Sequence, residues 1–216
     1  MQIFQLLFSD PAQGLIYLLS LFLAMCIAIS FHECAHAFMA YKLGDPTAKN
    51  LGRMSLDPMR HMDWLGFASF LLFGLGWAKP VLVNSKNLKH FRRDDALISL
   101  AGPLANLLIS FVFYGITFFV TYAGVQNDII LQILSIICSL NLNFAIFNIL
   151  PLPGLDGYHI VTSLFVRKGN QFLDFLNRYS TLILFALMWS GVFTLFTTWA
   201  GNGILGLFQS FFLLFI

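Results

Sequence analysis

Four long stretches of this chain carry no Asp, Glu, Lys, Arg or His: residues 11–31, 96–127, 129–155 and 179–216. Each is at least as long as the roughly 20 residues that an apolar helix needs to cross the core of a bilayer. Only 10% of all residues are charged, whereas about a quarter are charged in a typical soluble domain. The sequence therefore predicts an all-α polytopic membrane protein surrounded by lipid, and no nucleic-acid partner is expected.

Turn residues and prolines place the ends of the first three predicted helices. The first should end near the Gly-Asp-Pro of residues 44–46, and the second should run from about Arg92 to Gly124. The third should start at Asp128 and break at the prolines of residues 151–153.

The C-terminal part is expected to add further membrane segments. Residues 179–199 are long enough to span, residues 201–203 (Gly-Asn-Gly) should form a turn, and residues 204–216 are too short for a firm assignment. The total is about five to six membrane segments. We treat residues 1–216 as one transmembrane domain with a core at 11–168 and C-terminal membrane segments at 171–216.

Basic residues predict the orientation. Nine of the twelve Lys and Arg residues lie between positions 42 and 93, and the other three lie between 167 and 178. The positive-inside rule then puts both regions in the cytoplasm and the N-terminus outside. The expected location is a bacterial plasma membrane.

Residues 64–78 are uncharged but too short for an upright helical span, and they include three glycines. The Val-Leu-Val of residues 81–83 follows Pro80 and favours extended structure. We expect residues 53–83 to form a re-entrant β-hairpin-like segment between the first two spans.

His32 and His36 stand four residues apart in the first apolar helix, with Glu33 between them. Two His at this spacing lie on one helix face, so both imidazoles can reach one metal ion. The Glu can take a proton from the water that such an ion activates. Ionisable side chains are costly at membrane depth, which favours a functional metal site over structural histidines.

Asp156 follows the third helix, in a Pro- and Gly-rich segment. It should reach the cytoplasmic side, and His32 lies about 15 Å below that side because ten residues separate it from Lys42. The two motifs therefore meet at the same leaflet. A capping or turn role is the alternative for Asp156.

The chain contains five recognisable motifs: Phe-His-Glu-Cys-Ala-His-Ala at residues 31–37, the segments at 52–63 and 76–81, Leu-Ala-Gly-Pro-Leu-Ala-Asn at 100–106, and Asn-Ile-Leu-Pro-Leu-Pro-Gly-Leu-Asp-Gly at 148–157. With these motifs in this order, the chain resembles the site-2 proteases, in the compact form without PDZ or CBS domains. This resemblance implies an intramembrane zinc endopeptidase that hydrolyses a peptide bond within or near a transmembrane segment of its substrate protein.

The resemblance also implies roles for single residues. His32, His36 and Asp156 would bind one Zn²⁺ per chain, and Glu33 would be the general base. Asn148 would stabilise the oxyanion, with interhelical hydrogen bonding as the alternative. Asn106 is open to the same two interpretations, and His61 could be a neighbour of the metal or a hydrogen-bonding residue of the basic segment.

The expected substrate contact is an edge strand of the re-entrant segment, formed by Phe73, Gly74, Leu75, Gly76 and Trp77. An unwound transmembrane segment needs partners for its backbone, and an open strand edge supplies them. The partner is thus a transmembrane protein, while the oligomeric state is left open.

Two other functions fit parts of the sequence. A non-catalytic metal-binding or transport protein would need more ionisable residues along the first three spans, toward the outside. Other membrane metalloproteases, such as prenyl-protein processing enzymes, typically take the third ligand from a second helical Glu or His motif rather than from an Asp after a Pro-rich break.

Overall fold

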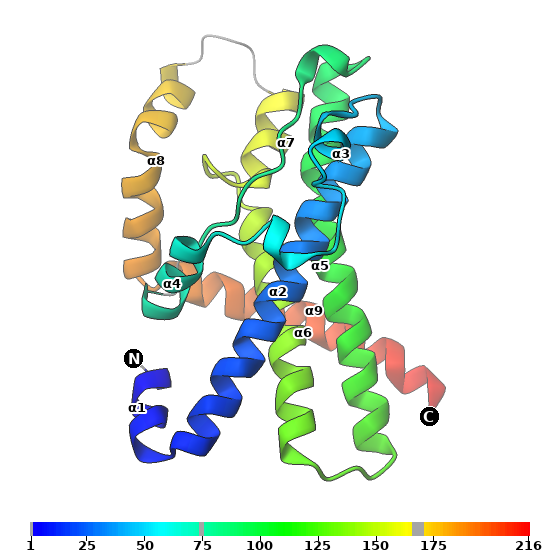
Figure 1. Cartoon of the computed structure of the whole chain (residues 1–216), viewed down its shortest axis with the longest axis vertical. Coiled ribbons are helices and arrows are strands. Elements are labelled where there is room, and N and C mark those ends of the chain that lie inside the picture. Colours follow the sequence, from blue (N-terminus) through cyan, green and yellow to red (C-terminus); the bar gives the residue numbers. More distant parts are fainter. Residues whose placement is uncertain (1, 74–75, 166–170) are drawn as a thin grey trace.

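The computed structural model describes residues 2–73, 76–165 and 171–216, and these ranges form an all-α fold (Figure 1). The long helices are α2 (Pro11–Lys42), α5 (Phe91–Tyr122), α6 (Asp128–Asn148), α8 (Gln171–Trp189) and α9 (Val192–Phe212). The short ones are α1 (Gln2–Ser9), α3 (Thr47–Asn50), α4 (Trp64–Phe73) and α7 (Asp156–Phe165), with 3-10 turns η1 (Pro58–Arg60), η2 (Ser85–Asn87) and η3 (Leu213–Phe215).

Four helical segments of the described chain are long and apolar enough to cross a membrane. They are α2, α5, α6 and the continuous stretch of α9 and η3. This confirms a helical membrane protein, whereas the number of five to six membrane segments stays a prediction. The helix α8 carries Asp174 and Arg178 and is not among the four.

The centre of the fold is a bundle of α2, α5 and α6. The helices α5 and α6 form an antiparallel hairpin, and α2 crosses beside both (Figure 1). Ala24, Ala28 and Ala37 of α2 are fully buried. Small side chains let helix backbones approach closely, and this packing replaces the hydrophobic effect as the main attraction between helices in lipid.

Local sequence signals explain where these helices begin and end. Asp10 accepts a hydrogen bond from the Gln13 amide (3.1 Å) at the start of α2, and Asn127 accepts one from the Ile130 amide (3.1 Å) at the start of α6. After α2, Gly44 adopts a φ of 108°, which favours glycine. The predicted ends of the first three helices are confirmed.

The segment between α6 and α7 directs Asp156 back toward α2. Pro151 prevents the helix from continuing, and Gly154 turns the chain with a φ of 93°. Asp156 is the first residue of α7, which packs on α5. A side chain at Gly157 would place its Cβ 2.0 Å from the carbonyl oxygen of Ile149, so only glycine permits this close turn.

Asp45 fixes the return of the long connection between α2 and α5. Its buried carboxylate accepts hydrogen bonds from the Thr47 hydroxyl (2.5 Å), the Asn84 amide (2.7 Å) and the Asn87 side chain (2.7 Å). This ties the end of residues 76–84 to the end of α2.

The predicted β-hairpin is not formed by the described residues of this connection. The helix α4 occupies its first arm, and antiparallel pairing is limited to one bridge between Met62 and Ala78. A helix satisfies its own backbone hydrogen bonds, which favours it for an apolar sequence at membrane depth. Residues 76–84 return as an uncoiled segment past α2 (Figure 1), and a re-entrant position in the membrane stays a prediction.

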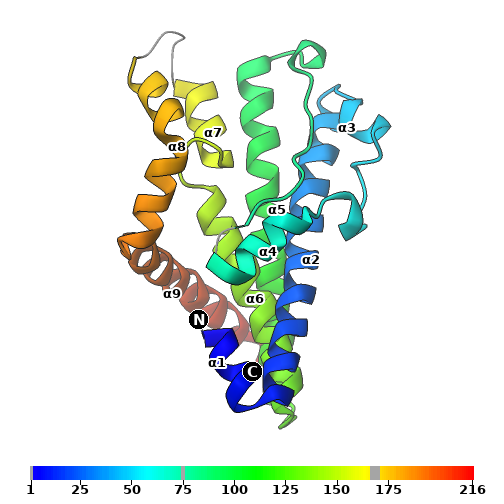
Figure 2. The ribbon, with the colours of Figure 1, turned by 60° about the vertical axis from the view of Figure 1, so that its left-hand side comes forward.

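The C-terminal turn lies at Gly191 and not at residues 201–203, where the sequence predicted it. The break lies between α8 and α9, where Gly191 has a φ of 73°, and α9 continues through Gly201 and Gly203. Gly201 is buried against α6, where a Cβ would make ordinary contacts with Leu142 and Ile146 at 3.8 and 3.9 Å. Figure 2 shows α8 leading into α9, which runs obliquely past α6.

Candidate metal centre and active site

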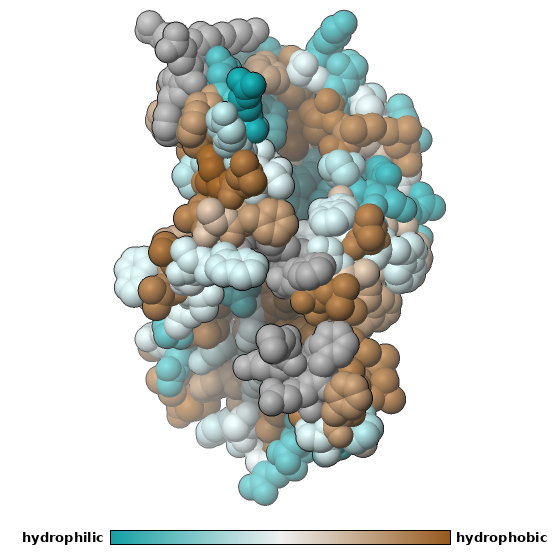
Figure 3. All heavy atoms as spheres, turned by 90° about the vertical axis from the view of Figure 1, so that its left-hand side faces the viewer, coloured by the Kyte–Doolittle hydropathy of each residue, from teal (hydrophilic) through white to brown (hydrophobic). Residues whose placement is uncertain are grey.

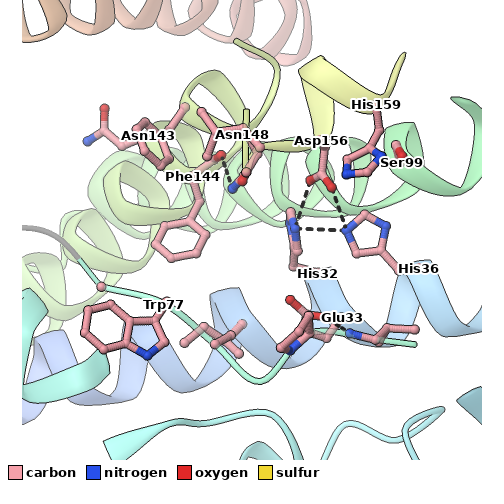
Figure 4. A pocket seen from close by; sticks show the side chains of 18 of the residues that line it. His32, Glu33, His36, Trp77, Ser99, Asn143, Phe144, Asn148, Asp156 and His159 are labelled. Carbon is pink, nitrogen blue, oxygen red and sulfur yellow. Dashed lines mark hydrogen bonds and ion pairs between the residues drawn. The ribbon is translucent and has the colours of Figure 1, made fainter. Parts of the chain in front are cut away.

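Three side chains from two separate helices converge at one point (Figure 4). The Nε2 atoms of His32 and His36 on α2 lie 3.0 Å apart. The carboxylate of Asp156 at the start of α7 lies 3.1 Å from Nε2 of His32 and 3.4 Å from Nε2 of His36. One potential ligand atom from each residue falls within a mutual distance of 4.8 Å.

The outer nitrogens of both imidazoles are held by α5. Nδ1 of His36 lies 2.7 Å from the backbone oxygen of Ile98, and Nδ1 of His32 lies 2.6 Å from Oδ1 of Asn106. A carbonyl oxygen can only accept, so Nδ1 of His36 carries the hydrogen and donates it. In the neutral ring Nε2 then keeps a lone pair directed at the site.

The donor set fits a cation. Oδ2 of Asp156 is buried and has no hydrogen-bond partner, although Nε2 of His32 is its close neighbour. With both Nδ1 atoms protonated, the Nε2 atoms and the carboxylate are all acceptors that face each other. A divalent metal satisfies such a set, and two His with one carboxylate is a ligand combination of catalytic zinc that leaves one position open.

Gly102 of α5 makes room for the site. A Cβ at this position would lie 2.4 Å from Nε2 of His36 and 2.6 Å from Cε1 of His32. Any side chain would therefore displace the imidazoles. This contact gives a physical reason for the Gly in the motif of residues 100–106.

Glu33 faces the same cavity from α2 (Figure 4). Its Oε2 accepts a hydrogen bond from the backbone amide of Val81 at 3.1 Å. The uncoiled segment of residues 76–84 therefore orients this carboxylate. The arrangement places a carboxylate on the same cavity as the potential metal ligands.

The cavity has a volume of about 880 Å³ and is lined by α2, α4, α5, α6, α7, α9 and the uncoiled segment. Its aromatic lining consists of Phe70, Trp77, Phe144, Phe147 and Phe193. Figure 3 shows the face that carries α4 and α8, which is hollowed in its upper half, with both hydrophobic and hydrophilic side chains around the hollow. The site can thus hold an apolar peptide segment.

Asn148 also lines the cavity, at the end of α6. Its Nδ2 donates to the Phe144 oxygen at 3.0 Å, and the second N–H of the amide remains for another partner. Of the residues expected to contact substrate, Gly76 and Trp77 line the cavity, and Phe73 is the last residue of α4. Gly74 and Leu75 lie outside the described residues.

His61 is separate from the metal centre and belongs to the long connection. It is fully buried, its Nε2 contacts the Ser55 oxygen at 2.7 Å, and its own carbonyl accepts from the Lys79 amide at 2.8 Å. The hydrogen-bonding interpretation of this residue is confirmed. The sequence did not reveal the part played by Ile98 and Gly102, and it left Asn106 open between two roles.

The fold and the site indicate a class of protein: a helical membrane protein in which two His and one Asp could hold a metal ion, with a Glu carboxylate on the same cavity. This combination is typical of metallohydrolases. The sequence of this chain resembles metalloproteases in particular. The profile "Peptidase family M50" matches residues 120–190, a range that contains Asn148 and Asp156.

Relatives from bacteria and archaea carry the same type of name. "Putative zinc metalloprotease YwhC" of Bacillus subtilis (strain 168) is 39% identical over 149 residues, 67% of this chain and 68% of that protein. "Putative zinc metalloprotease MJ0611" of Methanocaldococcus jannaschii is 28% identical over 168 residues, 77% of this chain and 78% of that protein. For "Putative zinc metalloprotease Rip2" of Mycobacterium tuberculosis (strain H37Rv) the identity is 32% over 145 residues, 61% of this chain and about half (52%) of that protein.

This chain belongs to peptidase family M50, the site-2 protease family, and is a zinc metalloprotease. The family resemblance seen in its motifs is confirmed. No solved structure matches the chain significantly.

Proposed function

We propose that this protein is an intramembrane endopeptidase that hydrolyses a peptide bond within or near a transmembrane segment of a membrane-protein substrate. The observation that carries the proposal is the convergence of three acceptor side chains beside Glu33, in a cavity among helices apolar enough to span a membrane. His32, His36 and Asp156 are the proposed ligands of one zinc ion per chain. Zinc supplies Lewis-acid chemistry to such a site: it polarises a carbonyl and acidifies water.

Glu33 is the proposed general base. It takes a proton from the attacking water and returns it to the leaving amine of the cleaved bond. One oxygen of the Glu33 carboxylate, Oε2, accepts the hydrogen bond from the Val81 amide. The other oxygen is then available for proton transfer while the side chain stays oriented.

Asn148 is the proposed oxyanion donor. Its amide lies on the same cavity as Glu33 and Asp156, and the N–H that is not bonded to Phe144 can be offered to a developing negative charge. The hydrogen bond to the Phe144 oxygen would hold the amide in place during the reaction.

The proposed substrate contact is the backbone of the segment around Trp77. A helix hides its own carbonyl groups in hydrogen bonds, so a transmembrane substrate must unwind before cleavage, and its freed backbone groups then need partners. The uncoiled segment lines the cavity at Gly76 and Trp77, and further along it the Val81 amide contacts Glu33. Backbone pairing here would align substrates of differing sequence.

The proposed orientation has the N-terminus outside and the site nearer the cytoplasm, in a bacterial plasma membrane. The positions of the helix ends in the structure support this orientation. The start of α5, the end of α7 and the start of α8 lie at one end of the molecule, whereas α1 and the α5–α6 turn lie at the other (Figure 1). Basic residues at the end of α2 (Lys42) and at the start of α5 (Arg92 and Arg93) thus lie at the same end of the molecule, which is consistent with the positive-inside rule.

Metal removal tests the proposed function. Purified protein should contain about one zinc per chain, because three ligands with one open position describe a single catalytic site. Chelation should abolish cleavage of a tagged single-span substrate in proteoliposomes, and readdition of zinc should restore it. The measurements are metal analysis and the amount of cleaved substrate. Undiminished cleavage by zinc-free protein would rule out the proposed mechanism.

Proline substitution tests the substrate contact. Trp77→Pro removes a backbone N–H from the proposed pairing segment and fixes φ, so cleavage of a membrane substrate should fall by about 10²-fold through misalignment. Zinc content should be unchanged. Trp77→Ala keeps the N–H and should lose less activity.

The control for this experiment is Leu82→Pro, because Leu82 belongs to the same uncoiled segment but is exposed and does not line the cavity. Leu82→Pro should cleave at close to the wild-type rate. Equal activity of both proline variants would contradict substrate pairing at Trp77.

A further inference from the structure

We propose that Asn106 is a positioning residue of the metal centre, which fixes the tautomer and the orientation of His32 through a buried chain of hydrogen bonds. The inference rests on the proposed zinc ligation by His32. It goes beyond that function because it assigns a task to Asn106 of α5 and to Asn141 of α6. Both side chains are fully buried.

The chain of hydrogen bonds begins at the backbone of α6. Nδ2 of Asn141 donates to the carbonyl oxygen of Ile137 at 2.8 Å. Because a carbonyl oxygen can only accept, the NH₂ end of the Asn141 amide must face Ile137. Its Oδ1 atom then faces Asn106.

The orientation of Asn106 follows from its two acceptors. Nδ2 of Asn106 donates to Oδ1 of Asn141 at 2.9 Å and to the carbonyl oxygen of Ala28 at 3.0 Å. Both N–H groups of its amide are therefore used, and its Oδ1 is directed at Nδ1 of His32 at 2.6 Å. Nδ1 of His32 must donate, so Nε2 of the neutral ring presents a lone pair to the metal centre.

If either amide were turned over, two acceptors or two donors would face each other between side chains that are fully buried. The network is therefore polarised in one direction, from the backbone of α6 to the imidazole. Outer partners of this kind hold the ring orientation and tautomer of metal-binding histidines. Asn106 also contacts α2 at two points one turn apart, Ala28 and His32, so it fixes the height of α5 along α2.

The two histidines are thus held by one face of α5. Ile98, Gly102 and Asn106 follow one another at intervals of four residues, opposite His36 and His32 on α2. A backbone carbonyl orients His36, a bare glycine admits both rings, and a side-chain amide orients His32. Within the motif of residues 100–106, Gly102 thus leaves room for the histidine pair and Asn106 orients one of its rings.

Asn106→Leu tests the inference. This variant keeps the volume approximately but removes the acceptor for His32, and zinc affinity should fall by about 10- to 100-fold. Affinity is measured by competition with a chelator of known strength. The visible spectrum of Co²⁺-loaded protein should also change, since the geometry around one ligand is released.

The matched control is Ser110→Ala. Ser110 lies one turn further along α5, is equally buried, and contacts Sγ of Cys138 on α6 at 3.4 Å without touching either histidine. The Ser110→Ala variant removes a polar contact between α5 and α6, the two helices that Asn106 and Asn141 also join. Its zinc affinity and Co²⁺ spectrum should match those of the wild type.

Asn106→Asp separates positioning from simple attachment of helices. Aspartate keeps an oxygen for Nδ1 of His32 but loses both N–H donors of the amide. The Asn106→Asp protein should therefore bind zinc more tightly than the Asn106→Leu protein. Asn141→Leu leaves the contact between Asn106 and His32 in place and should weaken zinc binding less than Asn106→Leu.

Two outcomes would overturn the inference: wild-type zinc affinity and Co²⁺ spectrum in Asn106→Leu, or equal zinc affinities of Asn106→Asp and Asn106→Leu. These results are distinct from a failure of the proposed function. That failure would appear as zinc retained by a variant without His32 and His36, whatever the effect of Asn106.

Discussion

Replacing Glu33 by Gln should lower the turnover rate by about 10²- to 10⁴-fold, the usual contribution of general acid–base catalysis, while zinc stays bound. Glutamine has nearly the same size, and its amide oxygen can still accept from the Val81 backbone N–H that Glu33 now binds. It cannot take up a proton at neutral pH. Cleavage of a single-span substrate and metal analysis of the same preparation measure both quantities together.

Cys34→Ala is the control for Glu33→Gln. Cys34 is the next residue of α2, is partly buried, and does not line the cavity. This variant should keep both zinc and activity. If Glu33→Gln cleaved at near the wild-type rate, another group would have to be the base. If it lost zinc as well, Glu33 would act as a ligand, and the separation of binding from chemistry would be wrong. A non-catalytic metal protein would show no cleavage that depends on Glu33.

The long helices and the metal-binding group could be predicted from the sequence because their signals are local. Runs without charge set the spans. Asp10 and Asn127 cap helices with their side-chain oxygens, and Gly44 ends one through its positive φ. The His pair needs only the helical repeat to share a face. Asp156 could be added because the predicted third helix runs back toward the end of the bundle that carries the His pair.

The C-terminal break could not be predicted because two glycine positions compete and only packing decides between them. Gly191 adopts a positive φ and ends a helix, whereas Gly201 is buried against α6 and continues one. The sequence around each is apolar, so no local signal separates them. The helix α4 shows the same limit. Residues 64–78 are too short for an upright span and were expected to belong to a hairpin, whereas the structure has a helix in which Gly66 allows the close approach of the Trp77 carbonyl.

The hydrogen bonds around the histidines could not be predicted from the sequence, for a different reason. Asn106 and Asn141 are polar residues in long apolar runs, and that fact shows only that each needs a partner. Their partners depend on how α5 and α6 are rotated against α2. A rotation of one residue would bring another side chain to His32.

We expect the double substitution His32→Ala/His36→Ala to reduce zinc from about one ion per chain to background, because a single carboxylate does not hold a zinc ion against water. Activity should be lost with it. The physical basis is the set of potential ligand atoms at this site: the two Nε2 atoms and the Asp156 carboxylate face one another, and removing two of the three residues leaves no binding geometry. Metal analysis after purification in detergent measures the effect.

His159→Ala is the matched control, because His159 lines the same cavity but contacts Asp95 of α5 at 3.9 Å instead of the metal-binding group. Zinc should stay bound in this variant. Asp156→Asn should weaken zinc binding without abolishing it, since an amide oxygen is a poorer ligand than a carboxylate but keeps the same reach. Full zinc occupancy in the double His variant, or loss of zinc in His159→Ala alone, would contradict the assignment of His32, His36 and Asp156. The first result would place the metal elsewhere in the chain, and the second would add His159, a second residue of α7, to the ligand set.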